Sequence, residues 1–371
     1  MPASTKSEDR TRLDGFEVEI FKLIQEHATS KQWREWLRAP LEHAAAEGNM
    51  DLFTRLMDAG TDGGAGWRGC LGRTLLGAAA DGKSEEMVLA LLNAGAQDDV
   101  DVKFGWRGES ALHVVAGNGA EKVSEALLLA GADPNVPDVL KESPLHRACR
   151  AGHDGIVNIL LLKGADPNSR TEHERRTPLH LAAAGGHVLC VSKLMFGGAD
   201  KDSCSSNGTT PLYLAARYNR LGAVEELLAA GANLDIRICR SFFFQRFSAL
   251  DIAANKGHVD VVRALVRHGS IVSKSDGSGH TALHHAASVD GPDRDNGDVI
   301  RVLLQAGATV LSKQRRPDTA AGHHFTLPSL EGLDRAVRSA PWWREAPTST
   351  IEGQTDAPHC TSLAPDPVLL V

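Results

Sequence analysis

Apolar positions along the chain recur with the spacing of short amphipathic helices that come in pairs. Within residues 177–200, one apolar segment starts at a proline, a glycine–histidine pair interrupts it, and a second apolar segment covers 188–196. A Gly-Ala-Asp sequence then marks a turn. The pattern predicts two short antiparallel helices followed by a loop or hairpin. The preceding pair shows the same helical stripe in its second segment, at Ile156, Val157, Leu160 and Leu161.

The helix pair is repeated about eight times. Leucines with matching context are separated by 34, 37, 33, 34, 33, 38 and 33 residues, and in six of the units a glycine follows the leucine by 19 residues. Such a period indicates a stacked array, because one unit cannot bury its own apolar face and must pack against its neighbours. The leucines are Leu41, Leu75, Leu112, Leu145, Leu179, Leu212, Leu250 and Leu283.

The motif at the start of each unit resembles the ankyrin repeat, whose signature reads T-P-L-H-x-A. The resemblance covers about residues 39–310. It implies an all-α ankyrin-repeat solenoid of paired antiparallel helices joined by loops or β-hairpin turns. The residues that carry it most clearly are Leu145, His146, Thr177, Pro178, Leu179, His180, Pro211, Leu212, Leu283 and His284.

Each motif position is expected to have a structural role. The threonine hydroxyl can cap the first helix, and proline suits a first helical turn whose N–H groups have no partner within the helix. The leucine enters the core. The motif histidines occur once per repeat at one structural position, so we interpret them as hydrogen-bond groups that brace the turns rather than as metal ligands or catalytic groups. They are His113, His146, His180 and His284.

The segments that flank the array differ from it in composition. We expect residues 1–12 to be disordered and residues 13–38 to form a helical cap that covers the first repeat, with an amphipathic partner-binding helix as the alternative. Residues 311–346 lack periodicity apart from a short helix. Residues 347–371 are rich in Pro, Thr, Ser and Ala, which predicts a disordered tail.

The composition fits a packed helical array, and the apolar segments of the chain bear on its location in the cell. Of 371 residues, 42% are apolar and only 5% aromatic, and 36 are glycine, which excludes wholesale disorder and suits short helices with frequent turns. There is no run of 18 apolar residues and no apolar signal segment at the start, so the sequence favours a cytoplasmic protein, with the nucleus left open. The six cysteines contain no Cys-x-x-Cys, which argues against a zinc ribbon.

Residues 77–84 match the Walker A nucleotide-binding pattern in full. A P-loop requires a strand before its glycines and a helix after its lysine. Here Leu75 to Ala80 fall in the first helix of the second repeat, so we interpret the match as coincidental. A nucleotide-binding enzyme remains the alternative, and an ATP-binding assay on the wild type and Lys83→Ala would discriminate the two.

Other chemistry-bearing residues do not form a recognisable site. Four aspartates in an insertion of the eighth repeat could hold Ca²⁺ weakly, but they lack the ligand order of an EF-hand, so we favour a solvated loop. No Ser/His/Asp or Cys/His set has local context, and the sequence therefore predicts no enzyme activity and no cofactor. The aspartates are Asp290, Asp293, Asp295 and Asp298.

One candidate binding surface lies on the first helices. The resemblance implies a concave face built from these helices and the loop tips, and the positions expected to be exposed on it are basic although the chain carries a net charge of −7. Such a strip suggests an acidic or phosphorylated partner protein, with a solvated face as the alternative. The candidate residues are Arg147, Arg150, Arg217, Tyr218 and Lys256.

A second candidate is the long connector between the sixth and seventh repeats. It places 19 residues between its glycine and the next motif leucine, where regular connectors use 14 or 15, and it holds four of the ten phenylalanines. Exposed aromatics beside arginine are typical of binding hot spots. The alternatives are a loop folded back on the stack, an aggregation-prone segment, or an error in the gene model. The candidate residues are Arg237, Arg240, Phe242, Phe243 and Phe244.

The sequence therefore predicts a non-catalytic scaffold or adaptor that acts as a monomer and binds a partner protein through stacked repeats. Association with nucleic acid through the basic strip is the third hypothesis, testable by salt-dependent retention on DNA or RNA. The net charge of −7 argues against it.

Overall fold

The structure is a computed structural model, and it describes residues 41, 43–59, 76–77, 79–80, 84–93, 100–239, 246–276, 279–287 and 296–308. All of them belong to the first of the chain's two compact units, Met1–Thr319. The expected cap at 13–38, the segments at 1–12, 311–346 and 347–371, and the Phe242–Phe244 connector lie outside the described residues.

Each complete repeat consists of a first helix and a second helix. The first helices are α6 (Ala111–Asn118), α8 (Pro144–Ala151), α10 (Pro178–Gly185), α12 (Pro211–Arg217), α14 (Ala249–Lys256) and α16 (Ala282–Ala287). The second helices are α3 (Met50–Ala59), α5 (Glu85–Asn93), α7 (Glu121–Leu129), α9 (Asp154–Leu162), α11 (Val188–Phe196), α13 (Leu221–Ala229), α15 (Val259–Arg267) and α17 (Gly297–Gln305).

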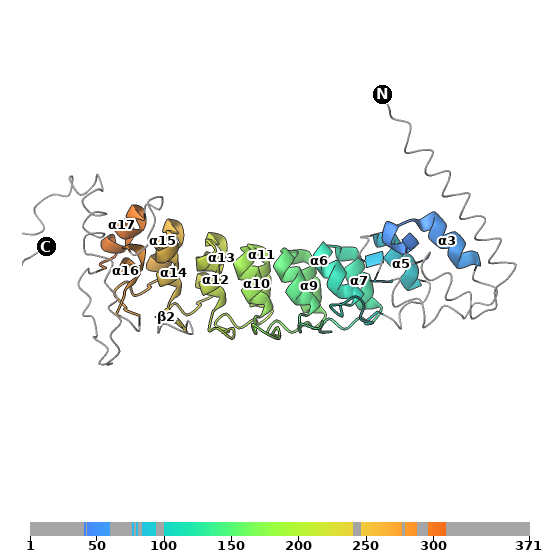
Figure 1. The fold of residues 1–371 in the computed structure, drawn as a ribbon, viewed down its shortest axis with the longest axis horizontal. Coiled ribbons are helices and arrows are strands. Elements are labelled where there is room, and N and C mark those ends of the chain that lie inside the picture. Colours follow the sequence, from blue (N-terminus) through green and yellow to red (C-terminus); the bar gives the residue numbers. More distant parts are fainter. Residues whose placement is uncertain are drawn as a thin grey trace, which may run out of the picture. The chain divides into compact units, whose positions relative to one another are not determined.

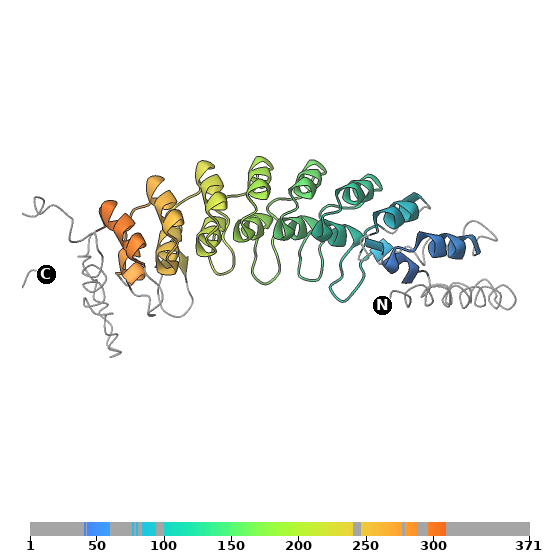
Figure 2. The same cartoon turned by 90° about the horizontal axis from the view of Figure 1, so that it is seen from above.

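The helices form two rows in which order along the chain is order in space. Each first helix from α6 to α16 contacts the first helices of the adjacent repeats, and the second helices from α5 to α17 do the same. Figure 1 shows the pairs following one another along the unit, and Figure 2 shows the loops that connect the repeats on one side of the stack. The predicted all-α solenoid is confirmed.

The first helices begin as the motif predicts. Ser143 and Thr177 precede α8 and α10 with extended backbones, at φ −89° and −91°, and prolines follow them at the first helical position. Glycines in the left-handed region end these helices, as at Gly152, where φ is +84°. A Cβ there would lie 2.4 Å from Nδ1 of His187. A residue without a Cβ is therefore required for the next repeat to approach.

Three motif histidines, His113, His146 and His180, each link their repeat to the next one. In His146, Nδ1 accepts a hydrogen bond from the backbone N–H of Ser143 at 3.1 Å, so the ring hydrogen is on Nε2, which donates to the carbonyl of Arg176 at 3.1 Å. His113 and His180 make the same pair of contacts. Burial lowers the pKa of His146 and His180 to about 4, which keeps both rings neutral.

Three other histidines each link their repeat to the one before it. His153, His187 and His258 precede the second helices α9, α11 and α15. Their Nε2 atoms contact the carbonyl oxygens of Gly117, Arg150 and Arg217 at 3.1, 3.2 and 3.2 Å. The end of each of these first helices is therefore held by the following repeat.

The core runs between the two rows and consists of aliphatic side chains. Leu112, Leu145 and Leu179 of the first helices have no exposed surface. Cys149 and Cys190 lie in the same core, and burial raises the pKa of the Cys190 thiol to about 11. Both thiols are therefore protonated packing groups.

A short antiparallel pair of strands flanks the long connector between the sixth and seventh repeats. β1 (Ile238–Cys239) pairs with β2 (Arg246–Phe247), and Ile238 lies opposite Phe247. Both side chains are buried, and the Phe247 ring lies 4.6 Å from the ring of His285. The two ends of the connector therefore pack against the stack.

Candidate partner-binding site

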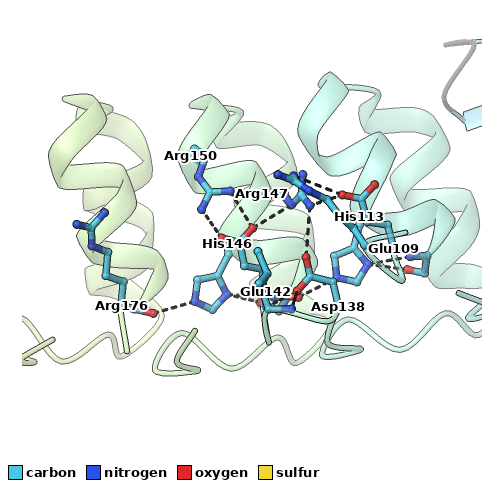
Figure 3. A network of polar contacts seen from close by, with 12 residues as sticks. Glu109, His113, Asp138, Glu142, His146, Arg147, Arg150 and Arg176 are labelled. Carbon is cyan, nitrogen blue, oxygen red and sulfur yellow. Dashed lines mark hydrogen bonds and ion pairs between the residues drawn. The ribbon is translucent and has the colours of Figure 1, made fainter. Parts of the chain in front are cut away.

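Arg147 lies in a network of carboxylates from two repeats (Figure 3). It contacts Glu109, which precedes the first helix of the previous repeat, and its Nη2 lies 3.3 Å from Oδ2 of Asp138. Its Nε lies 3.2 Å from Oε2 of Glu142. Asp138 also accepts the backbone N–H groups of Leu140 and Glu142, each at 2.8 Å, which shapes the loop. The guanidinium therefore connects two loops to one helix.

Arg150 forms a two-pronged ion pair with Glu142. Its Nη1 lies 2.8 Å from Oε2 of that carboxylate, and its Nη2 contacts Oε1. Burial raises the pKa of the Glu142 carboxyl, but the hydrogen bonds and charges of Arg150 and Arg147 outweigh burial, so this pKa lies below its ordinary value. The hydrogen bond to Glu142 raises the pKa of Arg150. Both groups are therefore charged at neutral pH.

The binding role of Arg147 and Arg150 stays a prediction: Arg150 is exposed as expected, with 46% of its side chain open to solvent, but both guanidinium groups are already paired with carboxylates. The Arg147 side chain is only 18% exposed. Two guanidinium groups face the carboxylates of Glu109, Asp138 and Glu142, so this part of the surface carries no excess positive charge. The sequence suggested a basic strip because the compensating carboxylates come from the loops and from the preceding repeat.

Arg217, Tyr218 and Lys256 have a different environment. Arg217 and Lys256 are the last residues of α12 and α14, which pack side by side, and Tyr218 follows Arg217 with 47% of its surface exposed. The Arg217 guanidinium lies 5.6 Å from the centre of the Tyr218 ring. In the part of the chain that the structure describes, no carboxylate lies within ion-pair distance of Arg217 or Lys256.

The backbone at Arg217 is held by the following repeat. The carbonyl of Arg217 contacts Nε2 of His258 at 3.2 Å. Asn219, two residues after the end of α12, has φ +58° in the left-handed region, where asparagine is better tolerated than most residues. The end of α12 therefore presents Arg217 and Tyr218 from a braced position.

The connector candidates are only partly described. The guanidinium of Arg237 donates to the backbone carbonyls of Ser275 at 2.6 Å and Lys274 at 3.3 Å, so it joins its loop to the next repeat. Arg240, Phe242, Phe243 and Phe244 lie outside the described residues. The binding role of the connector stays a prediction.

Of the nucleotide-site match at 77–84, the structure describes Gly77, Ala79 and Ala80, which are helical, and Ser84, which directly precedes α5. Leu76, Gly77, Ala79 and Ala80 are helical and buried. A Cβ on Gly77 would lie 2.7 Å from the ring of Phe104, which gives this glycine a packing role. These helical residues do not have the strand–loop geometry of a phosphate site. Lys83 itself is outside the described residues.

Other candidate chemistry remains unsupported among the described residues. There, no group of three or more His, Cys, Asp or Glu side chains is placed to hold a metal ion. Of the four aspartates in the eighth repeat, Asp298 alone is described, and it pairs with Arg301 at 3.1 Å. None of the described helices combines the length and apolar character needed to cross a bilayer.

Comparison with known families accounts for this architecture. The model of the family described as "Ankyrin repeats (3 copies)" matches residues 41–138, 97–171, 145–238 and 239–314, which together make up more than half of the chain. The chain belongs to the ankyrin-repeat family. Ankyrin repeats are general protein–protein interaction modules, so the surface residues described above belong to an array of the kind that binds proteins.

Two curated relatives match shorter stretches of the array. Transient receptor potential cation channel subfamily A member 1 of Homo sapiens is 35% identical over 85 residues, which are 23% of this chain and 7% of that protein. Transient receptor potential channel pyrexia of Drosophila melanogaster is 36% identical over 106 residues, 29% of this chain and 11% of that protein. The chain therefore spans only a small part of either relative.

Among solved structures, the human ASB11 ankyrin repeat domain is similar. It has a TM-score of 0.49 and 27% sequence identity, and the alignment covers 57% of this chain and 94% of that one.

Sequence reasoning missed the residues that organise the ankyrin surface. The carboxylates of Glu109, Asp138 and Glu142 lie outside the helical motif, and only their distances to arginine reveal them. The backward histidine links could have been found, because a histidine follows the interhelix glycine at His153, His187 and His258.

Proposed function

We propose that this chain is a non-catalytic interaction module, a scaffold or adaptor, that binds an acidic partner protein through Arg217, Tyr218 and Lys256. The observation that carries the proposal is the pair of cations beside an exposed tyrosine, with no carboxylate in ion-pair distance among the described residues. Arginine and tyrosine are enriched among residues that dominate binding energy. The proposal takes the monomer as the binding unit and the cytoplasm as its location.

Electrostatics favours an acidic partner at this patch. Two cations that have no carboxylate of a described residue within ion-pair distance attract an acidic surface and steer its approach, and salt weakens that attraction. The Arg147–Arg150 region cannot supply the same attraction, because its guanidinium groups already pair with carboxylates. We therefore place the binding patch at the sixth and seventh repeats.

The test is capture by the immobilised full-length chain, with bound proteins quantified by mass spectrometry. Arg217→Glu/Lys256→Glu is compared with Lys122→Glu/Arg267→Glu, which makes the same change in net charge at exposed positions of the second helices. The proposal predicts that the captured amount of some proteins is about tenfold or more lower with the first variant than with the wild type, and that the second variant captures them as the wild type does. Equal capture by the wild type and both variants would contradict it.

A further inference from the structure

A row of exposed apolar side chains crosses three consecutive second helices. The last residue of each helix is apolar and open to solvent: Leu129 in α7 is 70% exposed, Leu162 in α9 is 78% exposed, and Phe196 in α11 is 92% exposed. Single exposed apolar residues are ordinary, but exposed apolar residues that recur at one position of three adjacent helices mark an interaction surface. We refer to Leu129, Leu162 and Phe196 as the apolar row.

The fold does not require apolar residues at this position. The last residue of the second helix is polar or small in the other described repeats, and most of these residues are at least partly exposed. The apolar character is confined to the third, fourth and fifth repeats. The corresponding residues elsewhere are Asn93 in α5, Ala229 in α13, Arg267 in α15 and Gln305 in α17.

An acidic row runs beside the apolar row. Four residues after each apolar residue comes an exposed aspartate, at Asp133, Asp166 and Asp200. One oxygen of each accepts a backbone N–H two residues later, at 2.8, 2.9 and 3.1 Å, which shapes the turn after the helix. The turn does not need the charge, because an asparagine at the equivalent position, Asn233, makes the same bond at 2.9 Å.

Hydrogen bonds between repeats hold the acidic row in register. The backbone N–H of Asp166 donates to Oδ1 of Asn135 at 2.7 Å, and that of Asp200 donates to Oδ1 of Asn168 at 2.8 Å. The amides of these asparagines donate in turn to the carbonyls of Gly164 and Gly198. Each turn is therefore tied to the next, and the acidic row is preorganised.

The electrostatics of this edge favour a cationic ligand. The carboxyl ends of α7, α9 and α11 lie here, and each carries the negative end of a helix dipole. The three aspartates add to this potential. Lys163 and Lys201, the lysines adjacent in sequence to the two rows, compensate for only part of it.

The distance between neighbouring residues of the apolar row favours a helix over a strand as the bound segment. Packed helices lie about 8–10 Å apart, and a helix rises about 1.5 Å per residue, so one repeat corresponds to about five to seven residues of a helix laid across the row. Residues seven apart lie on one face of that helix. A strand covers the same distance in about three residues, which would turn alternate side chains away.

We propose that the apolar row binds an amphipathic α-helix of a partner protein, with apolar side chains at i, i+7 and i+14 and lysine or arginine along the flank that faces the aspartates. The apolar side chains cover Leu129, Leu162 and Phe196, and the cations pair with Asp133, Asp166 and Asp200. This surface is separate from the patch at Arg217 and Lys256, and its test uses other variants.

The experiment measures fluorescence anisotropy of a labelled helical peptide of about 18 residues, with leucine on one face and lysine on the flanks. A second peptide carries glutamate in place of every lysine. The full-length chain should bind the lysine peptide and not the glutamate peptide. Leu162→Ser/Phe196→Ser should weaken binding about tenfold or more, whereas Ala229→Ser/Gln305→Ser, at the same helix position outside the row, should not.

Charge is tested separately with Asp166→Asn/Asp200→Asn, which keeps the turn bond that Asn233 already makes. This variant should bind the lysine peptide about threefold to tenfold more weakly and with a smaller dependence on salt. The proposal is overturned if the wild type does not bind the lysine peptide, if the row variant binds it equally well, or if the glutamate peptide binds as tightly. A dimer in sedimentation that the row variant abolishes would also overturn it, because a second copy would then be the occupant.

Discussion

Lowering the pH from 7 to 5 should destabilise the array through its buried motif histidines. Burial lowers the pKa of His146 and His180 from the ordinary value of 6.5 to about 4. In the unfolded chain these rings bind protons below pH 6.5, while in the folded chain they stay neutral until about pH 4. The free energy of unfolding therefore falls as the pH falls through this window.

The size of the effect follows from the two pKa values. One pKa unit corresponds to about 1.4 kcal/mol, so each histidine costs about 2 kcal/mol by pH 5 and about 3 kcal/mol over the full window. Two such histidines cost about 4 kcal/mol by pH 5, a large part of the stability of an ordinary domain. The depressed pKa of Glu142 adds a loss in the same direction at still lower pH.

Urea unfolding followed by circular dichroism at pH 7 and pH 5 measures this loss. The control is His146→Gln/His180→Gln, because glutamine can still accept the N-cap N–H but does not titrate. We expect this variant to be less stable at pH 7 and to lose about 4 kcal/mol less than the wild type between the two pH values. The reasoning is refuted if wild type and variant lose the same stability.

Two further predictions concern the turns of the array. Gly152→Ala should destabilise the chain more than Gly131→Ala in urea unfolding. Both glycines have positive φ, but only a Cβ at position 152 would meet another side chain, at 2.4 Å from the His187 ring. Equal losses of stability would show that the His187 ring moves away at no cost. Asn168→Ala should cost about 0.5–1.5 kcal/mol, because it removes the acceptor of the Asp200 N–H at an exposed turn, and a change within experimental error would show that water replaces the bond.

The helix pairs could be predicted because their signals are local. The Thr177-Pro178 cap and start, and an apolar segment at 188–196, predict helices that the structure places at Pro178–Gly185 and Val188–Phe196. The repeat then predicts the stacking, since no unit can cover its own apolar face. The bracing role of the motif histidines followed from their recurrence at one position.

Which surface residues are exposed and which surface charges are paired could not be predicted in the same way. Arg147 and Arg217 both occur in first helices, yet Arg147 meets Glu109, which is 38 residues away in the sequence, and Arg217 meets no carboxylate among the described residues. The packing of neighbouring repeats decides which arginine comes within reach of a carboxylate and is neutralised. The apolar row was visible in the sequence, but its exposure depends on where each second helix ends.

The central claim is that the ends of α12 and α14 bind an acidic protein. Isothermal titration calorimetry tests it most directly, with a captured and purified partner titrated into the full-length wild type, Arg217→Glu/Lys256→Glu and Lys122→Glu/Arg267→Glu. The account predicts affinity about tenfold or more weaker for the first variant and unchanged for the second. Equal affinity for all three proteins, or a loss confined to the second variant, would contradict it.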